Sequence, residues 1–394
     1  MNPAISAINM DVAIIGGGIA GLWLLARLRE QGYGAVLIEQ DRLGSGQTIC
    51  AQGIIHGGAK YSLHGSLSDS AQAIAEMPAL WRRCLRGEGD VDLREARLLA
   101  EHQYLWATRA PASRLTAFFA GKLMHSRMTK VTDDLPAALQ HPDFRGTVYR
   151  LDEPIVEVAS VLTAFAHRYR EALLFSPKPV LPAADGTLTL HHPDHPPLTL
   201  APACTIFTAG TGNAALPWAA QQLRPLHMVM ARGAKLPGPL YAHCLGMSDT
   251  PRLTVTSHQD AKGRLIWYLG GGLAETGVQR SRDEQLRFAR QELVALLPWL
   301  DWNAVQFATF TVQRAEARQP GGIRPAGFSV QREGRIIAAW PTKLALTPRL
   351  AEQIEAELRT LAVPPHPLDG RKLADWPRPE IAVAPWDRED LAWT

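Results

Sequence analysis

The stretch SGQTICAQGIIHGGAKY, residues 45–61, places a single histidine, His56, among small and hydroxyl-bearing residues. An imidazole titrates near neutral pH, so His56 is a candidate general base for taking a proton from a substrate hydroxyl. A second candidate is Arg324 in the segment GGIRP. A guanidinium can hold a carboxylate through two parallel hydrogen bonds. Lys343, in WPTKLALTP, could add positive charge beside them.

Each of these side chains also has a purely structural interpretation. His56 could be hydrogen-bonded to the backbone without any proton-transfer role. Arg324 could form an ion pair with Glu316 or a neighbouring acid, and Lys343 could be a solvated surface lysine. Two further arginines of the same segment are alternative carboxylate anchors, namely Arg314 and Arg318.

Residues 11–39 contain the clearest element that could position such chemistry. The sequence DVAIIGGGIAGLWLLARLREQGYGAVLIEQ predicts a strand, a tight turn, a helix and a second strand that ends at Glu39. Gly16, Gly18 and Gly21 fit the GxGxxG spacing, in which glycines allow a pyrophosphate to approach the backbone at a helix N-terminus. Because a carboxylate at Glu39 would bind a ribose 2′-hydroxyl and disfavour a 2′-phosphate, NAD or FAD is favoured over NADP.

The segments after this unit resemble the glycine oxidase, sarcosine oxidase and D-amino-acid oxidase family of flavoproteins. LGSGQT resembles the second phosphate-side segment of the family. GIIHGGAKY resembles its flavin-lining loop, in the version found in glycerol-3-phosphate and 2-hydroxyglutarate dehydrogenases. TIFTAGTGN, GGIRP and AAWPTKLALTP resemble later blocks, so the resemblance covers almost the whole chain. One departure is the run 340–343, which stands where many amine oxidases of the family have a glycine-histidine pair.

This resemblance implies an FAD-dependent oxidoreductase that moves a hydride from the alpha carbon of a small amino or hydroxy acid to flavin N5. It implies that Arg324 binds the substrate carboxylate. A helix starting with Thr347 as N-cap would stabilise negative charge on the reduced flavin, and Lys343 would add to this effect. The implied FAD contacts are Gly16, Gly18, Ile19, Ala20, Gly21, Glu39, Gln40, Ser45, Gly46, Gln47, Thr48, Gln52, Gly53, Ile54, Val180, Ala209, Gly210, Trp340, Thr342, Lys343 and Leu344.

The expected fold class is α/β (α+β overall), a discontinuous Rossmann-like FAD-binding domain with an inserted antiparallel-sheet substrate domain. The FAD-binding domain is predicted over residues 1–90, 149–223 and 311–394, and the substrate domain over 91–148 and 224–310. In the second domain, RLTVTSHQDAKGRLIWYLGGG predicts a hairpin around residues 260–263. Ser281 and Glu284 have the spacing of a capping box at the start of a helix.

The composition gives no support for nucleic-acid binding, disulfide bonds or a metal site. Lys and Arg total 41 against 38 acidic residues, so the net charge of +3 gives no electrostatic case for nucleic acid. The four cysteines are widely spaced, which predicts neither a disulfide framework nor a zinc site. Cys50 could tether the flavin covalently, although packing explains it more simply. No metal is predicted, because turn chemistry accounts for the histidines of HHPDHPPL (His191, His192 and His195).

The sequence leaves function partly open. The expected enzyme is an oxidase or dehydrogenase acting on CH–NH or CH–OH groups, with oxygen or a quinone as the electron acceptor. The alternative is a flavin-retaining scaffold or regulatory protein without turnover, and bleaching of the flavin by substrate would separate the two. A flavin reductase is disfavoured because no second GxGxxG unit is present. No transmembrane segment or leader is predicted, so the expected location is the cytoplasm.

Overall fold

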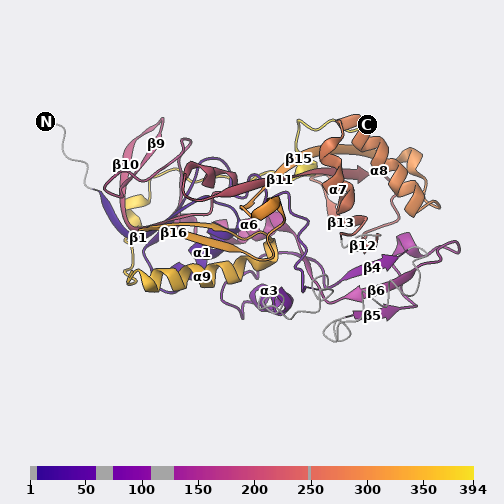
Figure 1. The fold of residues 1–394 in the computed structure, drawn as a ribbon, viewed down its shortest axis with the longest axis horizontal. Helices are drawn as coiled ribbons and strands as arrows, with labels where there is room; N and C mark the ends of the chain where they lie inside the picture. Colours follow the sequence, from indigo (N-terminus) through magenta and orange to yellow (C-terminus); the bar gives the residue numbers. More distant parts are fainter. Residues whose placement is uncertain (1–6, 59–73, 108–127, 247–249) are drawn as a thin grey trace.

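The fold is carried by two large sheets. The structure is a computed structural model that describes residues 7–58, 74–107, 128–246 and 250–394. Figure 1 shows the strands β1, β9, β10 and β16 toward one end of the long axis and β4, β5, β6, β12 and β13 toward the other, with β11 and β15 leading from one group to the other.

The first sheet is mainly parallel. Its strand order is β16-β17-β10-β1-β2-β8, and β9 pairs with β10 off this path. Only the β16–β17 and β9–β10 pairs are antiparallel among these described strands. The apolar runs of β1 and β2 are buried, as expected for strands covered on both faces. The strand bounds are β1 Ile8–Ile15, β2 Ala35–Glu39, β8 Leu173–Phe175, β9 Leu188–His192, β10 His195–Phe207, β16 Ser329–Glu333 and β17 Ile336–Trp340.

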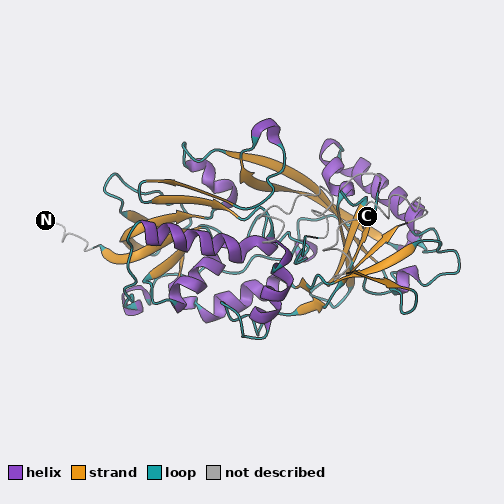
Figure 2. Cartoon of the chain, turned by 60° about the horizontal axis from the view of Figure 1, so that its bottom comes forward, coloured by secondary structure: helices purple, strands orange, loops and turns teal. Residues whose placement is uncertain are grey.

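Helices cover one face of this sheet (Figure 2). They are α1 Ile19–Glu30, α3 Met77–Leu85, α6 Val158–Arg168 and α9 Thr347–Thr360. The ring of Trp23 on α1 lies 4.7 Å from that of Trp81 on α3 and 5.9 Å from that of Phe165 on α6, measured between centroids. The opposite face packs against Val180, Leu373 and Trp376. The predicted strand, turn, helix and strand of residues 11–39 are therefore confirmed.

The start of α9 differs from the prediction by one position. Thr347 already has helical backbone angles (φ −53°, ψ −42°), and the N-cap is Leu346. The 3-10 turn Leu344–Leu346 runs directly into the helix, so the chain enters α9 without the extended residue that a side-chain cap requires. The buried Thr347 hydroxyl has no hydrogen-bond partner within the described part of the chain. The prediction that Thr347 caps this helix is wrong.

The second sheet is mainly antiparallel. Its order is β15-β11-β14-β13-β12-β4-β6-β5, and only β12 and β4 run parallel among its described pairs. The hairpin expected around residues 260–263 joins β13 to β14. A separate pair consists of β3 Leu98–Ala100 and β7 Ile155–Val156. The bounds in the second sheet are β4 Gln103–Ala107, β5 Met128–Val131, β6 Thr147–Leu151, β11 Gln221–Arg232, β12 Ala242–Cys244, β13 Leu253–Gln259, β14 Leu265–Gly270 and β15 Gln306–Ala317.

The two faces of the second sheet have different coverings. One face packs on α8 Arg282–Leu296, whose predicted capping box is present, since Ser281 and Glu284 exchange side-chain and backbone hydrogen bonds. The short helix α7 Gly272–Thr276 follows β14. The other face carries Tyr268 and His258. The His258 ring stacks on the Trp386 ring, with 4.1 Å between the ring centroids. Burial lowers the pKa of His258 to about 3, so this imidazole is neutral at physiological pH.

The segment 381–394 connects the two sheets. Ile381 forms a bridge with Leu43, which follows β2 of the first sheet. Farther along, the Asp387 carboxylate accepts a hydrogen bond from the Ala261 N–H in the β13–β14 turn (2.7 Å). Thr394 exchanges two backbone hydrogen bonds of 2.9 Å with Phe307 on β15. The last residues therefore pack on the second sheet.

The predicted domain limits can be compared with the strands of the two sheets. Residues 8–39, 173–207 and 329–340 contribute to the first sheet, and 103–151, 221–270 and 306–317 to the second. The predicted boundaries at 148/149, 223/224 and 310/311 fall inside β6, β11 and β15, respectively. The domain limits themselves stay a prediction. No helix among the described residues is both long and apolar enough to cross a membrane.

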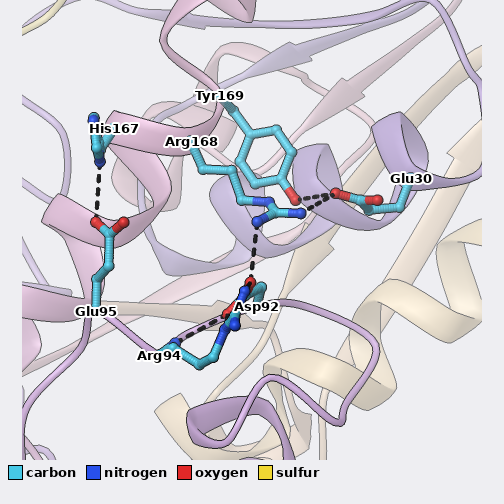
Figure 3. Close-up of polar contacts among 7 residues, drawn as sticks. All are labelled: Glu30, Asp92, Arg94, Glu95, His167, Arg168 and Tyr169. Carbon is cyan, nitrogen blue, oxygen red and sulfur yellow. Dashed lines mark hydrogen bonds and ion pairs between the residues drawn. The ribbon is translucent and has the colours of Figure 1, made fainter.

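A polar network joins α1, α6 and the loop that follows α3 (Figure 3). The Arg168 guanidinium donates to Asp92 (3.0 Å) and to Glu30 (3.2 Å), and the Tyr169 hydroxyl also donates to Glu30 (2.9 Å). Hydrogen bonds from Arg94, together with the charge of Arg168, lower the pKa of Asp92 to about 2. The network therefore favours the ionised form of Asp92 in the folded state.

We predict that Asp92→Asn lowers the urea midpoint of unfolding at neutral pH and that this difference disappears in acid. The pKa of Asp92 in the folded state, about 2, lies below its ordinary value of 3.8. Its stabilisation is therefore complete above pH 3.8 and is lost as the pH falls toward 2. Midpoints measured from pH 7 downward test this, with the exposed Asp375→Asn as control. A difference that persists unchanged into acid would contradict it.

Candidate active site

The glycine turn after β1 lies where β1 and β10 come together. A Cβ at Gly16, which has φ +107°, would lie 2.6 Å from the Ala209 Cα beyond β10. A Cβ at Gly21 would lie 2.2 Å from the Gly16 carbonyl oxygen. In the sheet β2 lies on one side of β1 and β10 on the other, so this turn occupies the point where the strand order reverses. Ligands of open parallel sheets bind outside the carboxyl ends of the strands at such a point.

The predicted acid lies beside this turn. Glu39 ends β2 and is 8% exposed. Its carboxylate accepts backbone hydrogen bonds from Gly17 (2.6 Å), Gln40 and Asp41 (both 2.8 Å). Burial raises the pKa of Glu39, and the three N–H donors oppose this effect. The carboxylate and the start of α1 thus border the same turn.

The segment 45–54 connects this turn to the second sheet. Thr48 Oγ1 accepts a hydrogen bond from the Ile19 N–H at the start of α1 (3.1 Å). Gln47 Oε1 accepts from the Ala315 N–H on β15 (3.0 Å), and Gln52 Nε2 donates to the Tyr268 carbonyl on β14 (2.9 Å). Gly53 is tightly enclosed, because a Cβ there would lie 2.0 Å from the Val156 carbonyl oxygen. Three more predicted residues, Ser45, Gly46 and Ile54, belong to this segment.

A third group of predicted residues lies at the ends of β10 and β17. The buried side chain of Asn213 accepts from the Ala209 N–H (2.9 Å) and donates to the Ala339 carbonyl (3.2 Å), so it links the two strand ends. Thr342 has φ +60°, and its buried hydroxyl has no hydrogen-bond partner among the described residues. Trp340, Lys343 and Leu344 flank it, and Gly210 follows Ala209.

Two of the residues predicted to contact FAD, Lys343 and Val180, are buried in the protein. Lys343 is buried, so the alternative interpretation as a solvated surface lysine is wrong. Val180 is also buried, in the core on the face of the first sheet opposite α1, with Leu174, Leu188 and Trp376. It lies in the loop between β8 and β9.

His56 is paired with a carboxylate that the sequence did not indicate. His56 Nδ1 lies 3.2 Å from Oε2 of Glu153, although the two residues are 97 positions apart. The other oxygen of the buried Glu153 accepts the Gly57 N–H at 2.7 Å, and Gln103 Nε2 donates to Oε2. The alternative prediction for His56 was a hydrogen bond to the backbone without any proton-transfer role. The observed partner is an acid that orients the ring.

A second histidine, His243 on β12, faces His56. The two ring centroids are 5.8 Å apart, and the rings are inclined by 15°. His243 Nδ1 lies 2.8 Å from the Thr254 hydroxyl on β13. His243, Gln103 and Thr254 belong to three neighbouring strands of the second sheet, so one face of that sheet supplies the polar surroundings of His56.

Arg324 takes part in none of the contacts that the described residues form around His56. It is exposed, in the loop between β15 and β16. Within the described ranges it forms no ion pair, and Glu316 pairs instead with Arg224 (3.2 Å). Arg314 is largely buried, and that burial lowers its pKa, as do the charges of Arg224 and Arg324. In the sheet, β15 and the strand of His243 are separated by β11, β14 and β13.

Comparison with known proteins identifies the fold and the family. The FAD dependent oxidoreductase (DAO) family model matches residues 11–343. The probable FAD-dependent oxidoreductase PA4991 of Pseudomonas aeruginosa is 43% identical over 399 aligned positions, which cover 97% of this chain and 98% of that protein. Its crystal structure superposes with a TM-score of 0.83 at 39% identity over the same shares of the two chains.

More distant structures share the fold alone. Glycine oxidase from Geobacillus kaustophilus has a TM-score of 0.62 at 16% identity, with 90% of this chain and 95% of that chain covered. L-alpha-Glycerophosphate oxidase from Mycoplasma pneumoniae has the same TM-score at 12% identity, with 96% and 98% covered. The chain belongs to the FAD dependent oxidoreductase family, and the resemblance inferred from the sequence, the fold class and the FAD cofactor are confirmed.

Proposed function

We propose that this member of the FAD dependent oxidoreductase family oxidises a small 2-hydroxy acid at its alpha carbon, with His56 as the base. The observation that carries this proposal is the 3.2 Å contact between His56 Nδ1 and the buried Glu153 carboxylate. An alcohol must release its hydroxyl proton as the hydride leaves, so it needs a base. A neutral amine does not, which makes an amino acid the second candidate substrate.

Glu153 prepares His56 for this task. A carboxylate beside Nδ1 holds the ring proton on that nitrogen, so Nε2 carries the lone pair that can accept the hydroxyl proton. The two hydrogen bonds to Glu153 from Gly57 and Gln103 stabilise its negative charge and fix its position. As the ring becomes an imidazolium, the adjacent carboxylate stabilises the new positive charge.

The cofactor would be held along the edge where β1, β10 and β17 end. FAD supplies the hydride acceptor for the reaction when it is bound. Three features support its binding there: the close approach at Gly16 and Ala209, the acid Glu39 beside the start of α1, and the buried Thr342 hydroxyl. Residues proposed to contact it are Gly16, Gly18, Ile19, Ala20, Gly21, Glu39, Gln40, Ser45, Gly46, Gln47, Thr48, Gln52, Gly53, Ile54, Val180, Ala209, Gly210, Trp340, Thr342, Lys343 and Leu344.

Arg324 is the proposed anchor for the substrate carboxylate. Its exposure leaves the guanidinium accessible to a ligand, and the absence of an acid partner within the described ranges leaves its hydrogen-bond donors available. Arg314 and Arg318 are the alternative anchors.

Gly18→Val is predicted to abolish FAD binding without preventing folding. A Cβ at Gly18 would meet only the Thr48 hydroxyl, at 3.2 Å, so a small shift of that side chain accommodates it. The two further methyl groups would occupy the space of the pyrophosphate at the start of α1. The ratio of flavin to protein absorbance in the purified variant measures the effect. The control is Gly327→Val, where a Cβ has no neighbour within 4 Å. Full FAD content in Gly18→Val would refute the placement.

His56→Asn is predicted to slow flavin reduction by the hydroxy acid about 10²- to 10⁴-fold, the usual contribution of general-base catalysis. Glu153→Gln removes the charge behind the ring and should lower the rate in the same direction. Anaerobic stopped-flow measurements give the rate of flavin reduction and the substrate Kd. The Kd should change little. The exposed His167→Asn serves as control. If His56→Asn stays within a few-fold of wild type while the substrate still binds, the substrate is an amine or the base is another residue.

Arg324→Lys is predicted to raise the substrate Kd roughly ten- to a hundredfold with FAD retained, because one charge-assisted hydrogen bond of the bidentate pair is lost. The rate of flavin reduction at saturating substrate should change less than the Kd. Arg287→Lys, an exposed arginine on α8, provides the control. An unchanged Kd in Arg324→Lys would exclude this residue as the anchor and direct attention to Arg314.

A further inference from the structure

His56, Glu153 and His243 form a compact set of metal-ligand types. One ligand atom from each of the three residues lies within 4.8 Å of the others. The residues come from three distant parts of the chain, the loop after residue 54, the turn after β6 and strand β12. The sequence predicted no metal site because these ligands share no short spacing.

The distances approach those of a tetrahedral zinc site. With Zn–N and Zn–O bonds of about 2.0–2.2 Å, neighbouring ligand atoms on one zinc ion lie roughly 3.3–3.5 Å apart. His56 Nδ1 and Glu153 Oε2 lie slightly closer than this, at 3.2 Å. Since the widest spacing in the set is at most 4.8 Å, closing the site requires a shift of roughly 1.5 Å or less.

Hydrogen bonds behind two of the ligands orient them as in known metal sites. His243 Nδ1 contacts the Thr254 hydroxyl at 2.8 Å, which makes Nε2 the ligand nitrogen of the proposed site. Glu153 Oε1 accepts the Gly57 N–H at 2.7 Å. Outer contacts of this kind fix the tautomer and direction of ligating histidines and carboxylates.

Burial and charge also suit a divalent ion. His243 is 1% and Glu153 5% exposed, whereas the His56 side chain is 28% exposed and leaves one side open. Two neutral imidazoles and one carboxylate compensate half of the charge of a divalent ion. Two nitrogens and one oxygen are a donor set that zinc accepts in proteins, with a fourth position for water or a ligand.

We propose that His56, Glu153 and His243 bind a divalent transition-metal ion of the zinc type, and that this ion inhibits the enzyme. A neutral imidazole that coordinates the ion through Nδ1 carries its proton on Nε2, so His56 can no longer accept a proton there. The binding site stands by itself, whereas the inhibition rests on the proposed role of His56 as base.

The test uses the FAD-loaded protein, first dialysed against EDTA and then against metal-free buffer. A small excess of zinc sulfate is added, unbound zinc is removed by dialysis, and retained zinc is measured by mass spectrometry. We expect about one zinc per chain in the wild type. His243→Asn, and independently Glu153→Gln, should retain less than a tenth of that amount. His192→Asn changes a histidine outside the cluster and should bind zinc like the wild type.

The second measurement is the rate of flavin reduction with and without zinc. In the wild type and in His192→Asn we expect zinc to slow reduction at least tenfold and EDTA to restore it. In His243→Asn the ratio of the two rates should be close to one. If the wild type retains no zinc, or if His243→Asn and Glu153→Gln retain as much as the wild type, the metal site is refuted. Zinc retained through the cluster without slower reduction supports the site and refutes His56 as base.

Discussion

The close approach of two backbone segments, the turn after β1 and the turn after β10, sets the arrangement on which the rest of the structure depends. At Gly16 the two segments are so near that a side chain would overlap the Ala209 backbone. This contact brings the start of α1, the acid at the end of β2 and the residues after β17 to a single edge of the sheet. Parallel strands expose the same ends of their backbones there, and the N-terminus of α1 adds a partial positive charge.

The second sheet is positioned through the segment 45–57. Its side chains alternate between the two halves of the molecule: Thr48 contacts α1, Gln47 and Gln52 contact β15 and β14, and His56 contacts Glu153. Because one short segment carries all of these contacts, the position of His56 relative to the glycine turn is set within about ten residues of chain. A change in the packing of either sheet would therefore displace His56.

The local features of this protein could be predicted from its sequence because their physical causes are local. The glycine turn, the acid Glu39, the β13–β14 hairpin and the Ser281 capping box each depend on residues a few positions apart. Thr347 shows the limit of that approach, since the preceding turn, and not its hydroxyl, starts α9. A Thr-Pro pair has the right composition for a helix start but does not specify which residue is extended.

Glu153, His243 and Asn213 could not be predicted because their roles come from tertiary contacts. Glu153 follows β6 and His243 lies on β12, so only the pairing of β4 with both strands brings them together near His56. A buried acid in the sequence DEPIVE carries no signal of a histidine 97 positions away. For Arg324, the local segment GGIRP did suggest a role, that of the carboxylate anchor. That role depends on tertiary neighbours, which the sequence does not show.

The pairing of Thr394 with Phe307 has a consequence for self-association. Among the described strands, β15 stands at the end of the second sheet, and its outer edge presents backbone groups that another chain could pair with. The two hydrogen bonds to Thr394 occupy the Phe307 groups near the start of this edge, and Trp393, which lies against the Arg232 guanidinium at 3.9 Å, packs beside it. Thr394 therefore occupies the backbone groups of Phe307 with which a strand of another chain would otherwise pair, and Gln47 accepts the Ala315 N–H farther along the same strand.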